Sequence, residues 1–395
     1  MRWKLIALGI IVAGIAVLGG AGWYQWQQIQ SQKQLNDTIL RAKNYMDLEQ
    51  YDKARETFER VLKEYPEISE DDSIAILVSL AEIYEMTGED DQALDIWKRI
   101  YEEHPSSAHI PRALVKLGEA AYDAQRDEEA KKYFQMLVEK FPRSEFVDDA
   151  KFGLIRLAHL ERGRMATRDA LRALLKEYPA SDRADEIETI LATINMDLLF
   201  SPSADQTEEV TVYTVKSGDT LSGIGRRFDI SPELLMEINR IKNPQNLPIG
   251  KRLFIPDVDF SIVVNKEDNS LVLYNKGEFF KRYPVRTGKR ELLTPTDAFR
   301  IQSKTKDPEW KKPSGATYAP GDPENALGSR WMAFDASSGL GIHGTNKPET
   351  IGTYASEGCV GMYNEDVEEL FNLVPIGTPI EITGKKRDNG KEERL

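Results

Sequence analysis

The sequence predicts a multidomain chain: a transmembrane helix, an all-α helical-repeat solenoid, a small βααβ module and a mostly-β domain, in that order. Three observations predict this fold class. The chain has 395 residues, which is too long for one ordinary core. Its N-terminal half repeats one helical pattern at a nearly fixed period. Its last third has short alternating apolar runs with Gly and Pro at the turns, as strands do.

The composition argues against one broad class of function. With 41% hydrophobic and 30% charged residues, it is that of a soluble globular protein. The formal net charge of −13 argues against nucleic-acid binding, because such binding needs a basic face that displaces phosphate counterions. A basic tail at residues 385–395 is the exception, and we expect a frayed, solvated terminus there.

Residues 1–22 predict export. Two basic residues precede an unbroken apolar run, residues 5–21, which is long enough to span a bilayer. Positive charge before the run and aromatic residues after it place the N-terminus in the cytoplasm and the rest of the chain outside. We therefore predict an anchor in the cytoplasmic membrane. A cleaved signal peptide is the alternative, because Gly19 and Ala21 are small enough for a cleavage site. Either reading places the protein in the cell envelope.

Residues 36–199 repeat one pattern with a period of 37 to 39 residues. Each repeat has a first position that is small or short, a large apolar residue four positions later and a proline twelve positions after the first. These positions are Ala54, Phe58 and Pro66; Ala93, Trp97 and Pro105; Ala130, Phe134 and Pro142; Thr167, Leu171 and Pro179. Such spacing is typical of a helical solenoid. The segment resembles tetratricopeptide repeats, which implies a surface for a protein partner; a simple spacer is an equal alternative.

After a polar linker at residues 200–209, residues 210–257 form a second unit. It opens with YTVKSGDTLSGI and closes with LPIGKRLFIP. A short strand, a turn, two amphipathic helices at residues 221–228 and 232–239 and a closing strand are expected. The unit resembles the LysM domain along its full length. The resemblance implies a βααβ fold that binds glycan strands containing N-acetylglucosamine, with a purely structural module as the alternative.

Residues 258–384 predict a mostly-β domain. A polar stretch at residues 304–328 interrupts it, and the aromatic residues and prolines of that stretch predict an ordered flap. Strands are expected at residues 261–264, 270–274, 277–285, 298–302, 331–334 and 379–383, and a helix at residues 364–374.

The chain has one cysteine, Cys359, and four histidines. One cysteine cannot make an internal disulfide, so in an exported protein it is either an inert buried thiol or a reactive group. A nucleophilic thiol needs a base or a neighbour that lowers its pKa. Because His104, His109 and His159 lie in the helical repeats, His343 is the one candidate base in the domain that holds the cysteine.

The residues around this pair suit acyl transfer. Gly344 follows His343 and lets the backbone approach closely, and Gly358 allows a tight turn before Cys359. The N–H groups of Gly358 and Cys359 could converge on an oxyanion, and Ser356 is placed to order the turn. The alternative is a buried cysteine that acts as a small hydrophobe, beside a histidine with ordinary partners.

Motifs along residues 260–382 favour the catalytic alternative. LVLYNKGEFFKRYPVRTGK, TPTDAFRI, PEW, GDPENALG, GIHGTN and SEGCVGM occur in that order, and the domain resembles L,D-transpeptidases. The resemblance implies that Cys359 is the nucleophile and His343 the general base and acid. It also implies that the Gly344 carbonyl orients the imidazole and that Ser356 belongs to the site.

The same resemblance implies the substrate and the reaction. The polar stretch becomes a lid over a peptide groove, and we assign Tyr318, Trp331 and Thr345 to substrate binding. The thiolate attacks the L-centre carbonyl at position three of a peptidoglycan tetrapeptide stem, D-alanine leaves, and an amine of a second stem attacks the thioester to form a crosslink. With water as acceptor the protein would be an L,D-carboxypeptidase, and with a protein amine a protein-to-peptidoglycan ligase. A non-catalytic wall-binding scaffold is a further alternative. No metal or cofactor is implied.

Two positions depart from the usual family pattern. The residue before Gly358 is often His and is Glu357 here, and the position two after the nucleophile is usually Arg and is Gly361 here. A carboxylate would raise the pKa of a neighbouring thiol, and the loss of a cation removes a group that favours the thiolate. Candidates for the missing charge are Arg286, Lys289 and Arg290.

Overall fold

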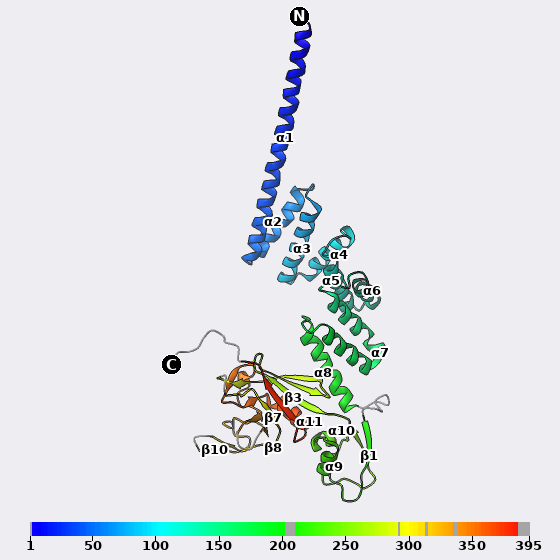
Figure 1. Cartoon of the computed structure of the whole chain (residues 1–395), viewed down its shortest axis with the longest axis vertical. Coiled ribbons are helices and arrows are strands. Elements are labelled where there is room, and N and C mark those ends of the chain that lie inside the picture. Colours follow the sequence, from blue (N-terminus) through cyan, green and yellow to red (C-terminus); the bar gives the residue numbers. More distant parts are fainter. Residues whose placement is uncertain (1, 202–209, 291–292, 313–314, 335–338, 386–395) are drawn as a thin grey trace. The chain divides into compact units, whose positions relative to one another are not determined.

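The computed structural model describes the backbone of residues 2–201, 210–290, 293–312, 315–334 and 339–385; side chains at 2–22, 24–25 and 160–162 lie outside this description. The chain divides into two compact units, Met1–Leu157 and Ala158–Leu395. The helices and strands of each are shown in Figure 1.

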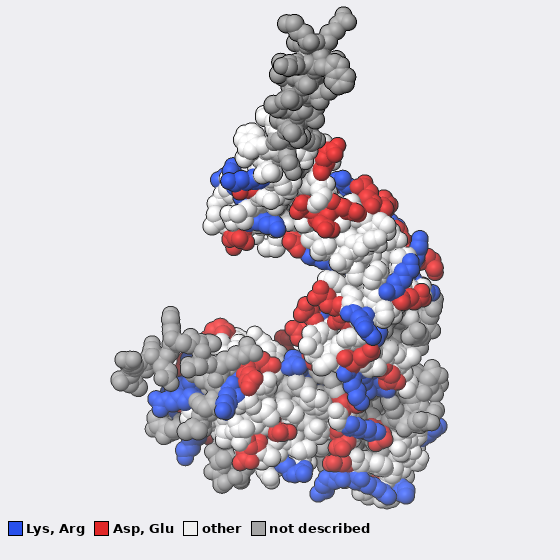
Figure 2. All heavy atoms as spheres, turned by 45° about the horizontal axis from the view of Figure 1, so that its top comes forward, with Lys and Arg blue, Asp and Glu red and all other residues white. Residues whose placement is uncertain are grey.

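The first unit is built of helices. They are α1 (Arg2–Asp47), α2 (Tyr51–Glu64), α3 (Glu70–Thr87), α4 (Asp90–Glu103), α5 (Ile110–Asp123), α6 (Asp127–Lys140) and the first part of α7 (Val147–Glu177). α7 is interrupted at Gly163, where φ is 77°, so that it comprises two helices joined by a kink. Several helices begin with acidic residues, such as Glu70 and Asp71 of α3, and Figure 2 shows acidic side chains gathered on this unit.

The repeated small and large apolar positions form the core of the helical pairs. All eight of them, from Ala54 and Phe58 to Thr167 and Leu171, are at most 5% exposed. A Cβ at Gly118 or Gly153 would overlap the ring of Phe134, so these glycines let neighbouring helices close on the aromatic residue. The structure therefore places the repeat pattern at the helix crossings, as the period predicts.

The predicted membrane anchor, residues 5–21, falls in α1 on side chains outside the described part of the chain. Within the described part, no helix is both long and apolar enough to cross a bilayer.

The second unit begins with the end of α7 and with α8 (Ala184–Phe200), followed by the βααβ module. The module consists of β1 (Val210–Thr214), α9 (Leu221–Phe228), α10 (Pro232–Ile238) and β2 (Arg252–Pro256), with β1 and β2 paired antiparallel. Both helices start at side-chain caps, because the Thr220 hydroxyl accepts the Gly223 N–H and the Ser231 hydroxyl accepts the Leu234 N–H.

The C-terminal domain contains a five-stranded sheet, β5-β4-β3-β15-β7, and a four-stranded sheet, β14-β12-β11-β8. The first has β3 (Phe260–Asn265), β4 (Ser270–Asn275), β5 (Glu278–Pro284), β7 (Ala298–Arg300) and β15 (Pro379–Thr383). The second has β8 (Ser303–Lys306), β11 (Arg330–Ala333), β12 (Gly341–His343) and β14 (Val360–Gly361). Two short pairs join β6 (Thr287–Gly288) to β13 (Tyr354–Ser356) and β9 (Trp310–Lys311) to β10 (Thr317–Tyr318), and α11 is Asn364–Leu373.

The polar stretch at residues 304–328 is thus partly strand, since it contains most of β8 and the β9–β10 pair. Asn325 is buried within it and donates to the carbonyls of Pro308 at 2.8 Å and Ala319 at 3.1 Å. These hydrogen bonds connect the beginning and the middle of the flap to its end, so the described part of this polar segment is ordered by its own contacts.

The βααβ module packs on α11 of the C-terminal domain. Lys304 Nζ lies 3.5 Å from a carboxylate oxygen of Glu233 in α10 and donates to the carbonyls of Phe371 at 2.6 Å and Val374 at 2.8 Å. Ser231 also donates to the Asn372 carbonyl. Because only 7% of the Lys304 side chain is exposed, the ammonium is enclosed by these oxygens.

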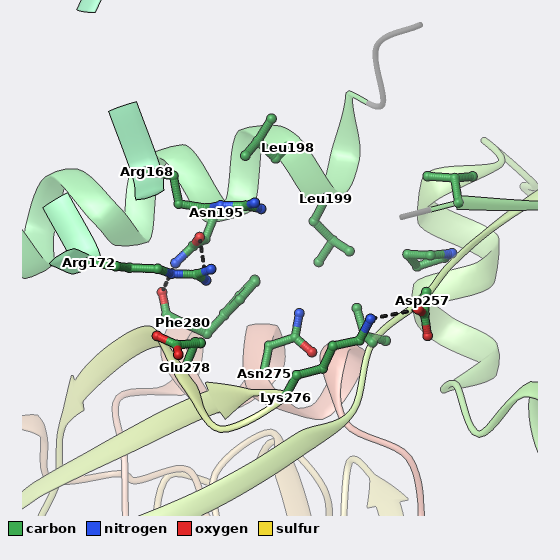
Figure 3. A pocket seen from close by; sticks show the side chains of 13 residues that line it. Arg168, Arg172, Asn195, Leu198, Leu199, Asp257, Asn275, Lys276, Glu278 and Phe280 are labelled. Atoms are coloured by element: carbon green, nitrogen blue, oxygen red, sulfur yellow. Dashed lines mark hydrogen bonds and ion pairs between the residues drawn. The ribbon is translucent and has the colours of Figure 1, made fainter. Parts of the chain in front are cut away.

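The last repeat helix packs on the hairpin of β4 and β5. Asn195 of α8 donates to the carbonyls of Phe279 at 3.2 Å and Phe280 at 2.9 Å. Figure 3 shows Asn195 and Arg172 above Phe280, beside a cavity of about 170 Å³. α8, the βααβ module and the β domain therefore form one continuous unit.

Candidate active site

One row of residues crosses three strands, β11, β12 and β14, and the adjoining backbone at Arg286. Trp331 pairs with His343, His343 pairs with Gly361, and Gly361 forms an antiparallel bridge with Arg286. Side chains at paired positions lie on the same face of a sheet. Trp331 and His343 accordingly have ring centroids 5.9 Å apart, and the Arg286 side chain occupies the space that a side chain at Gly361 would take.

Cys359 comes directly before β14, next to the start of β12. Its Sγ donates to the Gly339 carbonyl at 3.6 Å, and the thiol is half-buried. The preceding turn needs a glycine, because Gly358 has φ 131° and a Cβ there would overlap the Leu293 carbonyl. The thiol therefore lies beside the end of the β12–β14 pair, and His343 lies on the β12 strand of that pair.

Ser356 orders this turn. Its hydroxyl donates to the Cys359 carbonyl at 2.6 Å and accepts the Gly358 N–H at 3.1 Å. The Gly358 N–H could therefore bind an oxyanion, as predicted, only if its hydrogen bond to the Ser356 hydroxyl broke. Thr294, which the sequence did not single out, donates to the Gly358 carbonyl at 3.0 Å from the facing segment.

His343 is buried with 5% exposure, and its Nδ1 lies 2.6 Å from the Gly344 carbonyl. A carbonyl only accepts, so the neutral ring carries its proton on Nδ1 and leaves Nε2 as the acceptor. Burial lowers the pKa of His343 from 6.5 to about 4, helped by the charge of Arg286 and opposed by the carbonyls of Gly344 and Ala326. His343 is therefore neutral at pH 7.

Burial raises the pKa of Cys359, whereas the Gly341 backbone N–H and the charge of Arg286 lower it. A raised thiol pKa and a lowered imidazole pKa describe a resting pair in which both groups are neutral. For this thiol to attack a carbonyl it would first have to lose its proton, and the neutral imidazole is a group that could accept it.

Asn364, at the start of α11, holds the backbone that follows the base. Its side chain accepts the N–H groups of Ser329 at 3.2 Å and Thr345 at 3.1 Å, and donates to the Thr345 carbonyl at 2.9 Å. A Cβ at Gly344 would overlap this side chain, which explains the glycine. Asn364 was not among the residues chosen from the sequence, because no sequence pattern predicts that the first residue of α11 contacts the backbone that follows β12.

Comparison with known proteins identifies the families that the domains resemble. The family model for the L,D-transpeptidase catalytic domain matches residues 259–382, the LysM domain model residues 213–256 and tetratricopeptide-repeat models residues 39–108 and 112–144. YqjB of Bacillus subtilis, classed with the L,D-transpeptidases, is 38% identical over 32% of this chain and 72% of its own. YkuD of the same organism, classed likewise, is 34% identical over 43% of this chain and 97% of its own. The chain belongs to the L,D-transpeptidase family.

Solved L,D-transpeptidase structures are also similar to part of this chain. The catalytic domain of the E. faecium L,D-transpeptidase is 25% identical, with 32% of this chain and 97% of that chain covered and a TM-score of 0.26. An L,D-transpeptidase from Mycobacterium smegmatis is 15% identical, with 34% and 64% covered and a TM-score of 0.28. The chain thus spans slightly less than two thirds of that mycobacterial protein.

The residues that depart from the L,D-transpeptidase pattern differ in their surroundings. Glu357 is exposed and pairs with Lys289, and it is not among the groups that shift the pKa of Cys359. The expected rise in the thiol pKa therefore comes from burial and not from this carboxylate. Arg286 is the predicted compensating cation that acts on both Cys359 and His343.

The three residues assigned to substrate binding lie in different places. Trp331 adjoins His343. Tyr318 lies on the β9–β10 pair and stacks on Trp310 with ring centroids 5.3 Å apart. Thr345 is buried, and its hydroxyl accepts the Lys347 N–H at 2.9 Å, so it orders its own loop. Among the described residues, no cluster of three His, Cys, Asp or Glu side chains could hold a metal ion.

Proposed function

We propose that this protein is an exported L,D-transpeptidase that crosslinks peptidoglycan stem peptides through a thioester on Cys359. The observation that supports the proposal is that His343 lies on β12 and Cys359 directly before its partner strand β14, with Nδ1 of the imidazole bound to the Gly344 carbonyl and both groups neutral at rest. Family membership supplies the substrate class.

The reaction begins when Cys359 Sγ attacks the L-centre carbonyl carbon at position three of a tetrapeptide stem. As the S–C bond forms, His343 Nε2 takes the thiol proton. The C–N bond to D-alanine then breaks, and His343 returns the proton to the leaving amine, so the enzyme becomes a thioester. A side-chain amine of a second stem attacks the thioester, loses a proton to His343 and leaves a crosslink and the free thiol.

The remaining domains suit a role at the cell wall. The LysM domain would hold glycan strands, and its packing on α11 keeps it attached to the catalytic domain. Residues 5–21 would anchor the protein in the cytoplasmic membrane, and the tetratricopeptide-like repeats would offer a surface to a protein partner. Each of these roles follows from the sequence pattern and the family resemblance.

Intact-mass measurement after carbapenem exposure tests the nucleophile. The full chain is expected to gain one adduct, and Cys359→Ala is expected to gain none while keeping its circular dichroism spectrum. His343→Gln should slow adduct formation by about 10²–10⁴-fold, because it removes the base. His104→Gln is the matched control, since that histidine lies in the repeats beside Glu70, and it should react like the unchanged protein. A folded protein without an adduct would refute the enzyme assignment.

Product analysis with disaccharide-tetrapeptides then identifies the acceptor. Crosslinked dimers are the expected product, and they should disappear with Cys359→Ala. Tripeptides without dimers would show that water is the acceptor and would replace the transpeptidase with an L,D-carboxypeptidase.

A further inference from the structure

Arg286 fills the space that a side chain at position 361 would occupy. The two backbones bond to each other, with Arg286 N–H to Gly361 carbonyl at 2.8 Å and Gly361 N–H to Arg286 carbonyl at 3.0 Å. A Cβ built on Gly361 would lie 2.7 Å from Cγ of Arg286 and closer still to its Nε. The arginine side chain therefore lies across Gly361, and the two positions cannot both carry a side chain of that size without a shift.

The guanidinium of Arg286 is buried, and few polar groups of the described residues contact it. The residue is 8% exposed, its Nη1 donates to the Thr350 hydroxyl at 2.9 Å, and its Nε has no hydrogen-bond partner within the described ranges. The described residues form no ion pair with it. A buried cation without such a partner is costly, and this cost is offset when an anion forms beside it.

The charged and titratable groups around it identify that anion. His343 lies across Gly361 on β12 and has a lowered pKa. Cys359 precedes β14, and Glu349 lies on the short helix Pro348–Thr350; negative charge on either raises the pKa of Arg286. Glu357 is the remaining carboxylate near the thiol, and it pairs with Lys289 at the surface. Of these groups, only Cys359 gains negative charge during the reaction.

We propose that Arg286 sets the reactivity of Cys359: it is a positioning residue that lies across Gly361 from the neighbouring strand and stabilises the anion that forms on the sulfur. It takes the place of the cation expected two residues after the nucleophile. This inference rests on the proposed function only in requiring that Cys359 is the reactive thiol.

The pH dependence of alkylation by iodoacetamide tests the proposal on the full chain, which has one cysteine. Arg286→Gln should raise the pKa read from the profile by about 1 to 3, the usual effect of losing an opposite charge at short range. The rate at neutral pH should fall about threefold for each such step, because the thiolate fraction falls tenfold while the basicity of the sulfur partly compensates. Arg300→Gln is the matched control. Arg300 lies on the edge strand β7 and donates a hydrogen bond to the Gly377 carbonyl, so the alkylation profile should not change.

A reciprocal exchange tests the geometry. Gly361→Arg alone should lower the thermal midpoint, because two side chains then compete for one space. The double variant R286A/G361R should recover both the midpoint and the alkylation profile, since it returns one cation to the same place. Arg286→Lys, which keeps the charge, should stay close to the unchanged protein and gives a reading if Arg286→Gln does not fold.

Three outcomes overturn the inference. The first is an unchanged alkylation profile for folded Arg286→Gln. The second is an alkylation profile for Arg286→Lys that is displaced as far as that of Arg286→Gln. The third is a folded double variant whose alkylation profile is no closer to that of the unchanged protein than the profile of R286A is. Alkylation needs no stem peptide, so a normal shift together with absent crosslinked product would refute the proposed function alone. A normal carbapenem adduct with an unchanged profile would refute this inference alone.

Discussion

Acidification should protonate His343 only near pH 4. The residue is buried, and burial together with the neighbouring charge of Arg286 lowers its pKa from 6.5 to about 4. Each pKa unit corresponds to about 1.4 kcal/mol, so holding this ring neutral costs about 3 kcal/mol of folding stability at low pH. Between pH 6.5 and 4 the unfolded chain binds the proton and the folded chain does not. The free energy of unfolding therefore decreases as the pH is lowered through this window. Above pH 6.5 the ring is neutral in both states and contributes no such dependence.

Nuclear magnetic resonance of protein labelled with ¹³C in its histidine rings measures this directly. Four ring signals are expected, and the one lost in His343→Gln belongs to this residue. Its midpoint should lie near 4, and it should move upward in Arg286→Gln, because the charge that opposes protonation is gone. The rate of carbapenem acylation should follow the same protonation, staying level down to about pH 5 and then falling. A midpoint at 6.5 or above would refute the argument, since burial and the arginine would then have no effect on the ring.

Two further predictions concern contacts around the site. Lys304→Ala should lower the free energy of unfolding by about 3 kcal/mol, because it leaves two backbone carbonyls without the buried ammonium and leaves Glu233 with only the half-exposed Lys306. Lys306→Ala removes that half-exposed cation, which lies 3.4 Å from the same carboxylate, and should cost under about 1 kcal/mol. Denaturant unfolding compares the two, and equal effects would contradict the enclosed pair. Ser356→Ala should slow carbapenem acylation at unchanged circular dichroism, because the turn at Gly358 loses the hydroxyl that fixes it; an unchanged acylation rate would show that the turn holds without it.

The proposed nucleophile and base could be chosen from the sequence because so few candidates exist. One cysteine and one histidine share the C-terminal domain, and the glycines beside them mark a tight turn and a close approach. The repeat positions were equally accessible, because a period depends only on the spacing of residues along the chain. Both inferences use local information, which a sequence carries directly.

What the sequence could not supply is the register between strands distant along the chain. Thr294 and Asn364 reach the site because their segments lie next to β14 and β12, and no local pattern in the sequence predicts those contacts. The sequence named Arg286 only as one of three candidate cations, and the strand register singles it out. The expectation that Glu357 raises the pKa of Cys359 failed for the same reason, because it too depended on where a side chain lies in the fold. Adjacency in sequence suggested a carboxylate facing the thiol, but the side chain points to solvent and to Lys289.

Helix α11 links the LysM domain to His343, the proposed base. At its end, the Asn372 and Val374 carbonyls accept Ser231 of the LysM domain and the Lys304 ammonium, which also binds Glu233. At its start, Asn364 holds the backbone after His343. A helix of ten residues is stiff at this length, so the contacts at its two ends are fixed relative to each other. If the LysM domain binds a glycan strand, as we propose, the distance from that strand to the thiol is therefore set by packed structure and not by a flexible linker, and this would restrict the stem peptides that Cys359 could meet.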